Sequence, residues 1–276
     1  MRIEPGFVFS ANSLQDYLDC PRRFELRYLL KLAWPAVESE PALKFEKHML
    51  LGKQFHQLAQ QYLNGIESSL LTENILDSDL SIWFGNWLGY IGEKKFKYKY
   101  IEFPLRAVIG DFQIMAVYDL IATTEIGGLL ILDWKTSIKI PKKENLAQRA
   151  QTMLYPYVAA EAVSRFIPEE SILPQQVQME YVFVSHSDLN TIGFSYTPEQ
   201  HISTQQYLQE LIHEITMRES GEFESCQDER RCKFCVYRSL CERGELAGSM
   251  DEIEEAGVGE DSLLHLDFDF QDEIAF

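Results

Sequence analysis

The run Leu129-Leu-Ile-Leu-Asp133-Trp-Lys135 decides the fold, together with Met115-Ala-Val-Tyr-Asp119, from which a pair of glycines separates it. Alternate residues of a strand share a face, so Asp133 and Lys135 fall on one face and Trp134 on the other. Both faces are apolar up to this polar pair, which is typical of a central strand covered on both sides. Burying an unpaired charge costs several kcal/mol, on the order of 3 or more, so the two side chains need partners.

Asp119 supplies a second carboxylate, at the end of the preceding alternating run. Two facing carboxylates repel each other unless a cation lies between them, and hard carboxylate oxygens suit Mg²⁺ or Mn²⁺. A lysine two residues from such a ligand, here Lys135, can orient or deprotonate an attacking water and stabilise charge that develops on a phosphate. The alternative interpretation is a buried ion pair between Asp133 and Lys135 that only fixes strand register.

The composition is that of a globular protein, with 276 residues of which 46% are hydrophobic. The net charge of −18 is concentrated at one end, because residues 245–276 hold 11 acidic residues and no Lys or Arg and leave −7 for the rest. We therefore expect one domain over 1–244 and an acidic, disordered tail over 245–276. There is no run of 18 uncharged apolar residues and no signal peptide, so we expect a cytoplasmic protein without a membrane partner.

Hydrophobic periodicity predicts the order of the elements. Helices are expected over 10–33, with a break at Cys20-Pro21, and over 44–65, 79–93, 144–165 and 198–219. Strands are expected from residue 94 to the Gly110-Asp111 turn, and over 112–121, 129–135, 176–185 and 191–196. The first three strands form an antiparallel meander, whereas the helix that follows makes the third and fourth parallel. The expected fold class is α/β (α+β), with a mixed central sheet flanked by helices.

Two of these helices carry candidate site residues four positions apart, and therefore on one face. Gly52 and His56 form the first pair, in which the missing side chain of Gly52 leaves room next to the imidazole. A single helical histidine is, however, more often packed or solvated than a ligand. Gln151 and Tyr155 form the second pair. Lysines at 94, 95, 97 and 99 could contact a phosphate backbone, although a solvated strand edge also explains them.

Cysteines gather towards the C-terminal end of the expected domain. Cys232, Cys235 and Cys241 lie within ten residues, in an irregular segment without an apolar face, which is hard to fix without a metal. A tetrahedral or cubane site needs a fourth ligand, for which Cys20 and Cys226 are the candidates. Disulfides are not expected in a cytosolic chain.

Together, these motifs resemble the RecB-like branch of the PD-(D/E)XK nuclease superfamily, and in particular its iron-sulfur members, which include CRISPR-associated exonucleases and AddB-type helicase-nuclease subunits. The matching positions, in chain order, are Cys20-Pro21-Arg22, Gly52 and His56, Asp119, Asp133-Trp134-Lys135, Gln151 and Tyr155, and Cys232, Cys235 and Cys241. They extend over most of the chain. The resemblance implies a restriction-endonuclease-like core and a four-cysteine cluster that joins the N- and C-terminal segments.

The resemblance also implies a role for each residue. The residues that would bind Mg²⁺ or Mn²⁺ are His56, Asp119, Asp133 and, through its carbonyl, Trp134. Lys135 would assist the water, while Gln151 and Tyr155 would position DNA. The ligands of a 4Fe-4S cluster would be Cys20, Cys232, Cys235 and Cys241. Thiolates also suit zinc, but we favour iron because one distant cysteine with three close ones is the family's arrangement.

The chain departs from the family pattern at three places. The family usually has a glycine near Ala116-Val117 and often an arginine where this chain has Leu120, which leaves phosphate contact and substrate choice open. Cys226 has no counterpart in the pattern. It could replace Cys20 in the cluster, but the upstream match favours a spare thiol.

The last ten residues, Asp267-Phe-Asp-Phe-Gln-Asp-Glu-Ile-Ala-Phe276, resemble the C-terminal docking tip of bacterial single-stranded DNA-binding proteins. Such a peptide binds a basic pocket through its carboxylates and last aromatic ring. We therefore expect the tail either to bind a helicase or DNA-repair partner or to compete for the DNA groove. A solubilising acidic tail is the alternative.

Two functions fit the sequence. The first is a metal-dependent DNA nuclease, an exonuclease on single-stranded DNA ends, acting in repair, recombination or defence. The second is a catalytically silent DNA-binding or assembly subunit of a helicase-nuclease complex. The presence of Asp119, Asp133 and Lys135 favours the first, because a silent relative has no physical reason to keep a buried charged trio.

Overall fold

The structure is a computed structural model that describes residues 3–4, 6–32, 40–125, 127–137, 139–165, 167, 172–185 and 189–244, with the side chains of 40–46 excepted. The expected tail over 245–276 lies outside the described residues. The chain divides into two compact units. We call residues 2–11 with 50–218 the sheet unit, and residues 12–49 with those from 219 onward the cysteine unit.

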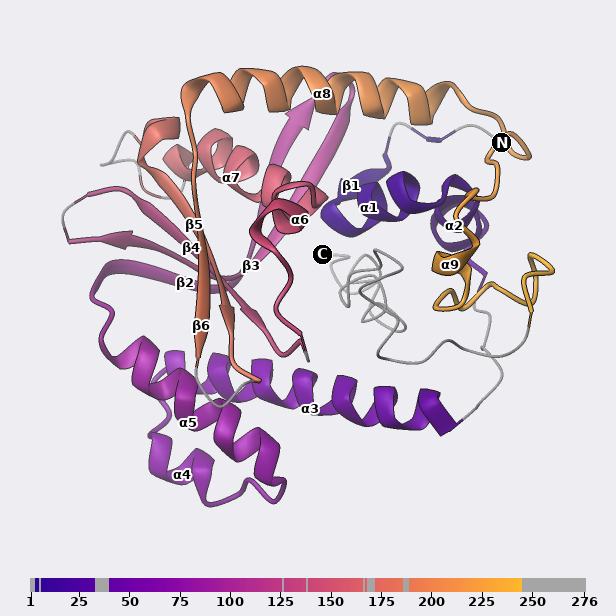
Figure 1. Ribbon diagram of the computed structural model, residues 1–276. Coiled ribbons are helices and arrows are strands. Elements are labelled where there is room, and N and C mark those ends of the chain that lie inside the picture. Colours follow the sequence, from indigo (N-terminus) through magenta and orange to yellow (C-terminus); the bar gives the residue numbers. More distant parts are fainter. Residues whose placement is uncertain are drawn as a thin grey trace. The chain divides into compact units, whose positions relative to one another are not determined.

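A mixed, six-stranded sheet forms the centre of the sheet unit (Figure 1). Its strands are β1 (Val8–Ser10), β2 (Phe96–Ile109), β3 (Phe112–Thr124), β4 (Leu129–Lys135), β5 (Val177–Phe183) and β6 (Asn190–Ser195). The predicted meander is formed by β2, β3 and β4, which pair antiparallel. The predicted crossover makes β4 and β5 parallel, and β6 pairs antiparallel with β5. The predicted fold class is confirmed.

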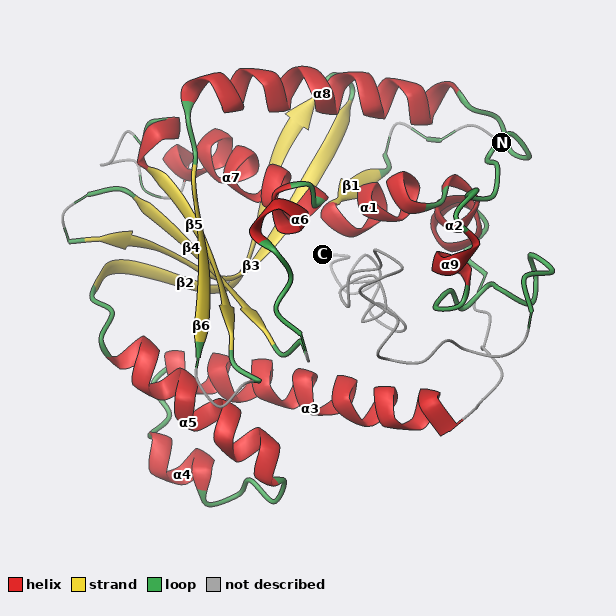
Figure 2. Cartoon of the chain, viewed as in Figure 1, coloured by secondary structure: helices red, strands yellow, loops and turns green. Residues whose placement is uncertain are grey.

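Helices lie on both faces of this sheet (Figure 2). The helices of the chain's described part are α1 (Ala11–Asp19), α2 (Pro21–Phe24), α3 (Glu40–Leu63), α4 (Ser68–Thr72), α5 (Ser78–Gly92), α6 (Lys143–Ala147), α7 (Ala150–Ala162), α8 (Pro198–Met217) and α9 (Glu229–Cys232). In the described residues, no helix combines the length and the apolar character that crossing a bilayer would require.

The first face of the sheet packs against α3 and α5. Phe55 of α3 and Trp87 of α5 lie in one buried cluster with Leu132 and Trp134 of β4. The Trp87 and Trp134 rings meet edge to face, with centroids 5.3 Å apart. Each large side chain buried in this way contributes on the order of 2 kcal/mol, so the helix that carries His56 is firmly fixed to β4.

The second face packs against α7, and α8 packs in turn on α7. Leu154 and Val158 of α7 are fully buried. Tyr118 of β3 reaches the same helix, because its hydroxyl donates to the carbonyl of Tyr155 at 2.8 Å. This arrangement places the start of α7 next to the C-terminal end of β4, where Asp133 lies.

The predicted helix over 144–165 is interrupted, which corrects the prediction of one continuous helix. It consists of α6 and α7, with an extended backbone at Arg149 between them. In a continuous helix the Leu146 carbonyl would accept from the amide of residue 150. Here it accepts from the amide of Arg149 at 3.0 Å and from the hydroxyl of Thr152 at 2.6 Å, so a tighter turn and a side chain replace the helical bond. The break lets α7 start at the end of the sheet where Asp133 lies.

β1 is a strand that the sequence did not predict. Its three residues pair parallel with β3, in the register Val8 with Gln113 and Ser10 with Met115. A three-residue strand is too short to produce a periodic signal. It forms because the neighbouring edge of β3 offers free hydrogen-bonding groups beyond the end of its pairing with β4.

The cysteine unit joins the first helices to the chain after α8. As predicted, the helix breaks at Cys20, between α1 and α2, and a π-helical turn over Glu25–Leu29 follows. The fully buried carboxylate of Glu25 accepts from the amide of Gly221 at 2.8 Å and from the hydroxyl of Ser220 at 2.9 Å. These bonds connect residues about 195 positions apart within this unit.

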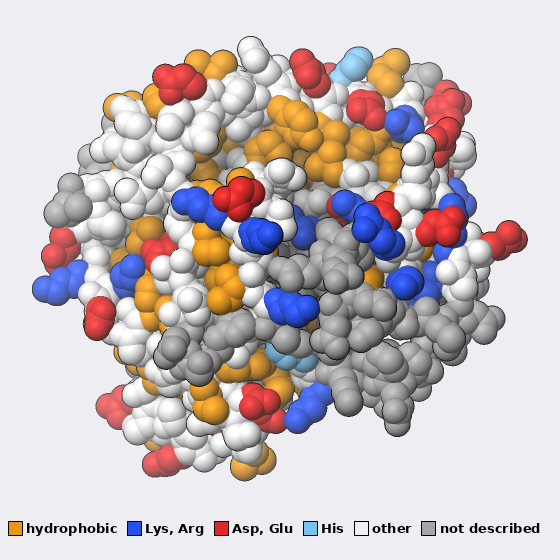
Figure 3. Space-filling model, viewed as in Figure 1, with side chains coloured by type: hydrophobic (Ala, Val, Ile, Leu, Met, Phe, Trp, Pro, Cys, Tyr) orange, Lys and Arg blue, Asp and Glu red, His pale blue; other side chains and the backbone are white. Residues whose placement is uncertain are grey.

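The molecular surface carries charges of both signs. On the face seen in Figure 3, basic and acidic side chains are scattered among uncharged ones. Two lysines of the run at the start of β2 have partners within the sheet unit. The Lys94 ammonium lies 3.5 Å from the Glu180 carboxylate, and Lys99 donates to the carbonyl of Leu63 at 2.7 Å. These contacts favour the structural interpretation for those two lysines.

Candidate active site and cysteine cavity

Three side chains from three elements of the sheet unit converge beside β4: His56 of α3, Glu102 of β2 and Asp119 of β3. Nδ1 of His56 lies 3.3 Å from Oδ1 of Asp119. Among the described residues, these three offer ligand atoms that all lie within 4.8 Å of one another. One imidazole nitrogen and two carboxylate oxygens form a donor set suited to a divalent cation. The donor set fits the Mg²⁺ or Mn²⁺ expected from the sequence.

Glu102 was not a candidate in the sequence, where it is one more residue of an alternating strand. Its φ of 48° lies in the left-handed region, which costs a non-glycine residue on the order of 1 kcal/mol. The pairing of β2 with β3 has the same register on both sides of it, Ile101 with Leu120 and Phe103 with Tyr118. The distortion is therefore confined to Glu102, which lies opposite Asp119.

The face that β3 presents to each helix changes at the same level of the sheet. Leu120 packs in the cluster formed by α3 and α5, whereas Tyr118, two residues earlier, bonds to α7. Strict alternation would put both on one face. Asp119 lies between these two residues, and its carboxylate contacts the imidazole of His56 and the backbone amide of Trp134. Backbone strain at such a point is a common feature of functional sites.

The second carboxylate oxygen of Asp119 contacts β4. Oδ2 accepts from the backbone amide of Trp134 at 2.7 Å. The backbone pairing of β3 with β4 ends one residue away, at Leu120 with Leu132. Asp119 thus replaces the missing ladder bond and holds the last residues of β4. Trp134, the predicted carbonyl ligand, is adjacent to this carboxylate.

Asp133, Lys135 and Gln151 form a second polar group, on the side of β4 that faces α7. The Lys135 ammonium lies 2.8 Å from Oδ2 of Asp133 and donates to Oε1 of Gln151 at 3.2 Å. The Gln151 amide donates to Oδ1 of Asp133 at 2.6 Å. Asp133 is only 4% exposed. A buried carboxylate of this kind is compensated by the two donors that surround it.

Tyr155 and Tyr181 border this second group. Tyr155 lies one turn after Gln151 and interacts with its side chain and with the charges of Asp133 and Lys135. Burial is the main cause that raises the pKa of the Tyr155 phenol, and Asp133 adds to it. The ring of Tyr181, which pairs with Asp133 across β4 and β5, lies under the Lys135 ammonium, 5.6 Å from its centroid.

The Tyr181 hydroxyl makes a hydrogen bond with Thr152 that the sequence did not indicate. It lies 2.8 Å from Oγ1 of Thr152. Because the Thr152 hydroxyl already donates its proton to the carbonyl of Leu146, the Tyr181 hydroxyl must be the donor. Tyr181 therefore fixes the first turn of α7, and with it the neighbouring Gln151.

The two polar groups are electrostatically coupled. Burial and the charges of Asp119 and Asp133 raise the pKa of Glu102 to about 7, against the opposing effect of His56. Burial disfavours the imidazolium of His56, but Asp119, with smaller contributions from Glu102 and Asp133, outweighs it and raises the pKa to about 9. Without a metal the site thus holds protons that a bound cation would displace.

Gly52 lies one turn before His56 and faces Thr136, just after β4. An added Cβ at position 52 would lie 2.7 Å from Oγ1 of Thr136. The space left by the missing side chain is therefore taken by this hydroxyl. A glycine here allows α3 to approach the end of β4 closely.

The structure thus groups the predicted site residues in two sets. His56 and Asp119 lie together with Glu102, and Asp133 lies together with Lys135, Gln151 and Tyr155. Trp134 lies between Asp133 and Lys135 in β4, and it connects the two sets because its backbone amide donates a hydrogen bond to Asp119. Asp133 is outside the group whose ligand atoms lie within 4.8 Å of one another, because its oxygens contact Lys135 and Gln151.

The cysteine unit contains a separate candidate site. All five cysteines of the chain line one cavity in this unit. The four predicted ligands are therefore brought together, although Cys20 is more than 200 positions from the others. Cys226, the unmatched thiol of the sequence, is at the same cavity.

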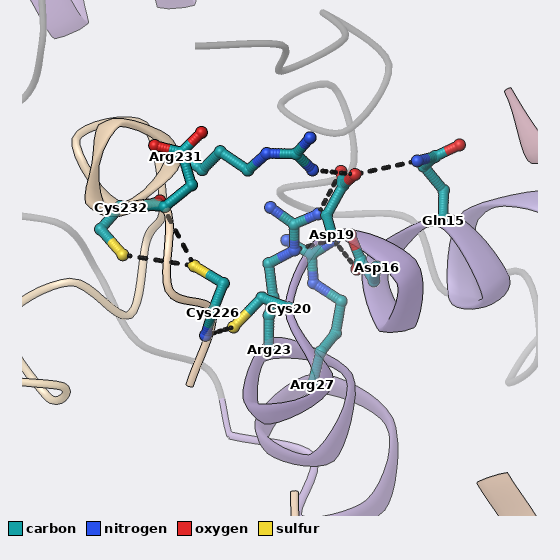
Figure 4. Close-up of polar contacts among 10 residues, drawn as sticks. Gln15, Asp16, Asp19, Cys20, Arg23, Arg27, Cys226, Arg231 and Cys232 are labelled. Atoms are coloured by element: carbon teal, nitrogen blue, oxygen red, sulfur yellow. Dashed lines mark hydrogen bonds and ion pairs between the residues drawn. The ribbon is translucent and has the colours of Figure 1, made fainter. Parts of the chain in front are cut away.

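Ion pairs hold Cys20 beside the C-terminal segment (Figure 4). Asp19, which precedes Cys20, accepts from Arg231, which precedes Cys232. Asp19 also accepts from the buried guanidinium of Arg23 at 2.9 Å. A charged residue next to each of the two cysteines thus helps to join the two segments, in addition to the backbone hydrogen bond from Arg22 to Glu224.

The donors of the cavity fit a thiolate-bound metal centre. Burial raises the pKa of Cys235 to about 11, and burial with the adjacent Cys20 and Cys232 raises that of Cys226 to about 12. A bound cation would stabilise thiolates and offset this effect. Arg23, Arg231, Arg238 and Arg243 also line the cavity and suit the negative charge of such a centre. Sulfur donors of this kind fit a 4Fe-4S cluster or zinc.

Two solved structures are similar to this chain. The crystal structure of a "putative exonuclease" from Eubacterium rectale is similar at 12% sequence identity and a TM-score of 0.50, over 97% of this chain and 93% of that chain. The crystal structure of SSO0001 is similar at 14% identity and a TM-score of 0.39, over 87% of each chain. At 12% identity the first likeness supports the fold alone. The search of curated proteins found no match.

A family model decides the relationship. The model described as the PD-(D/E)XK nuclease superfamily matches residues 8–242, which span both units and all the candidate site residues. This match extends over most of the chain, and the observed mixed sheet is the one that the family resemblance implies. The protein belongs to the PD-(D/E)XK nuclease superfamily.

Proposed function

We propose that this protein is a metal-dependent DNA nuclease that hydrolyses phosphodiester bonds as an exonuclease on single-stranded ends. The observation that supports it best is the convergence of His56, Glu102 and Asp119 next to the buried pair of Asp133 and Lys135. Nucleases of this superfamily use divalent metals. A site that only stabilises the fold would not need a set of possible metal ligands next to a buried Asp–Lys pair.

The metal would be held by the first group together with two residues of β4, one of them from the second group. We assign this role to His56, Asp119, Asp133 and the Trp134 carbonyl, and we add Glu102. When bound, Mg²⁺ or Mn²⁺ supplies a Lewis acid that polarises the scissile phosphate and lowers the pKa of a bound water. Asp119 has a double task, because its other oxygen keeps the amide of Trp134, and hence the end of β4, in place.

The second group would act on the substrate. Asp133 and Gln151 hold the Lys135 ammonium at 2.8 and 3.2 Å, so that it is directed before DNA binds. A pre-oriented ammonium in a water-poor site stabilises charge that develops on a phosphate. Gln151 and Tyr155, one turn apart at the start of α7, would position the DNA strand.

The cysteine cavity would hold a 4Fe-4S cluster on Cys20, Cys232, Cys235 and Cys241, with zinc as the alternative metal. Such a centre would connect α2 to the segment after α8. This connection would add to the hydrogen bonds of Glu25 with Ser220 and Gly221 and to the ion pair of Asp19 with Arg231. We assign it a structural role. The proposal also includes a helicase or DNA-repair partner, for which the acidic residues 267–276 provide the argument.

The test is cleavage of end-labelled single-stranded DNA with Mn²⁺ by the wild type and by Asp133→Asn. We expect the variant to lose at least about 100-fold in rate, because a metal carboxylate in a site of this kind supplies several kcal/mol. Asp111→Asn is the matched control, since Asp111 lies in the exposed β2–β3 turn, and it should cleave as the wild type does.

Closed circular single-stranded DNA separates the two modes of cleavage. An exonuclease leaves it intact while it degrades the linear form. Wild-type protein that binds DNA without cleaving either form, in the presence of Mn²⁺ or Mg²⁺, would identify a silent DNA-binding subunit and refute the proposal.

A further inference from the structure

Cys226 is the one cysteine without a role in the proposed metal centre, yet it lies at the centre's edge. Its Sγ is 3.7 Å from Sγ of Cys232. Its backbone amide donates to Sγ of Cys20 at 3.4 Å. Figure 4 shows the three sulfur atoms beside one another.

The approach of Cys226 to Cys232 follows from the local backbone. Asp228 caps the short helix α9, because its side chain accepts from the amide of Arg230. Cys232 is the last residue of this helix. The turn brings the chain back on itself within six residues, and the ion pair of Arg231 with Asp19 fixes the returning segment against α1.

Cys226 contacts two of the four proposed ligands, Cys232 through its sulfur and Cys20 through its backbone amide. A tetrahedral metal or a cubane cluster takes four sulfur ligands, so a fifth thiol in contact with one of them remains available for other chemistry.

We propose that Cys226 and Cys232 form a reversible disulfide in the metal-free protein. The two sulfur atoms must close from 3.7 Å to the roughly 2.05 Å of an S–S bond, which requires rotation of the two side chains. The oxidant is a small disulfide such as oxidised glutathione. The thiolate of one cysteine attacks it and releases one glutathione; the thiolate of the other then attacks the mixed disulfide and releases the second. Two protein thiols are oxidised, one glutathione disulfide is reduced to two thiols, and both protons pass to solvent or to the released thiols.

The modification has a consequence for metal binding, which rests on the proposed role of Cys232 as a ligand. The disulfide occupies Cys232 and leaves three of the four ligands free, so the oxidised chain cannot bind the metal tightly. Reduction returns the ligand. Cys226 would thus keep an empty centre in a recoverable form, because a disulfide is not oxidised further to sulfinic acid as a free thiol can be.

Peptide mapping tests the proposal directly. The full chain is freed of metal with a chelator and a reductant, desalted without oxygen, treated with oxidised glutathione, alkylated and digested with trypsin. The sequence places each cysteine in a different tryptic peptide; Cys226 is in 219–230, Cys232 in 232–233 and Cys20 in 3–22. We expect a loss of two free thiols and a link between 219–230 and 232–233. A link from 219–230 to 3–22, or no loss of thiols, would overturn the proposal.

Co²⁺ binding, followed by its thiolate charge-transfer absorbance, supplies the second measurement. The oxidised wild type should lose this signal and regain it after reduction. Cys226→Ser should bind Co²⁺ before and after oxidation, since it cannot form the link. If Cys226→Ser fails to bind Co²⁺ before oxidation, Cys226 is a ligand and the assignment is wrong. Neither measurement involves DNA, so a protein without nuclease activity that forms this link would refute the proposed function and leave the disulfide established.

Discussion

Replacing Gly52 by alanine tests how closely α3 must approach the end of β4. The new Cβ would lie 2.7 Å from Oγ1 of Thr136, inside the roughly 3.5 Å at which non-bonded heavy atoms pack best. Overpacking of this kind costs about 1–3 kcal/mol. Alanine gains about 1 kcal/mol over glycine inside a helix. We therefore expect the free energy of unfolding to fall by about 0–2 kcal/mol.

A double-mutant cycle separates these two effects. Thr136→Ala removes Oγ1, and the nearest remaining atom of residue 136 is its Cβ at 3.8 Å from the new methyl group. In that background Gly52→Ala should stabilise the protein by about 1 kcal/mol, its helix propensity alone. The coupling energy should therefore be about 1–3 kcal/mol. Urea unfolding followed by tryptophan fluorescence measures all four proteins. Equal effects of Gly52→Ala in both backgrounds would refute the reasoning.

The same set of variants connects packing to activity. Gly52 lies one turn before His56, so a helix displaced at Gly52 moves the imidazole away from Asp119. We expect slower cleavage by Gly52→Ala and recovery in the double variant with Thr136→Ala. Gly85→Ala is the matched control, because Gly85 lies in α5 and an added Cβ there meets nothing within 4 Å. It should be stabilised and fully active.

Two further predictions concern the polar groups of the site. Tyr181→Phe removes the proton donated to Thr152, a loss on the order of 1 kcal/mol, and should lower kcat several-fold with little change in KM. Tyr196→Phe is the control, and in the same steady-state assay it should leave both kcat and KM unchanged. In the metal-free protein, the stability that protonated His56 contributes is complete below its unfolded pKa of 6.5 and is lost as pH rises through about 9. Protonated Glu102 acts in the same direction, complete below 4.5 and lost as pH rises through about 7. Because Mn²⁺ must displace both protons, its affinity should rise between about pH 6 and 9, and calorimetry should show a less steep rise in His56→Gln. An affinity that falls over this range would contradict the assignment of His56 and Glu102 as metal ligands.

The sheet and its buried charges could be predicted because several independent signals agree there. The apolar run before Asp133, the glycine turn and the helix before β5 each point to a central strand with a parallel neighbour. Lys135 follows at the spacing expected for the same face. At β4 the local sequence pattern and the tertiary contacts favour the same structure, so periodicity alone was sufficient to predict the strand and its neighbours.

The features that were missed depend on particular side-chain contacts that the periodic pattern does not show. A left-handed backbone at Glu102 has no signature in a strand of alternating residues, because glutamate does not favour it; opposition to Asp119 in space accounts for it. The break before α7 contains neither proline nor glycine, and it arises from the hydroxyl of Thr152. The position of Cys226 beside Cys232 likewise follows from a turn that Asp228 caps, which spacing between cysteines does not reveal.

The irregular course of β2 also affects how the protein meets other copies of itself. β2 pairs with β3 and, among the described residues, with no second strand, so it forms an outer edge of the sheet. Pro104 has no amide proton to offer there, and the left-handed residue at 102 bends the line of carbonyls. A strand from another molecule could not form a continuous series of backbone hydrogen bonds along the middle of β2. The deformation at Glu102, whose carboxylate lies beside the proposed metal ligands His56 and Asp119, is therefore also expected to oppose edge-to-edge aggregation.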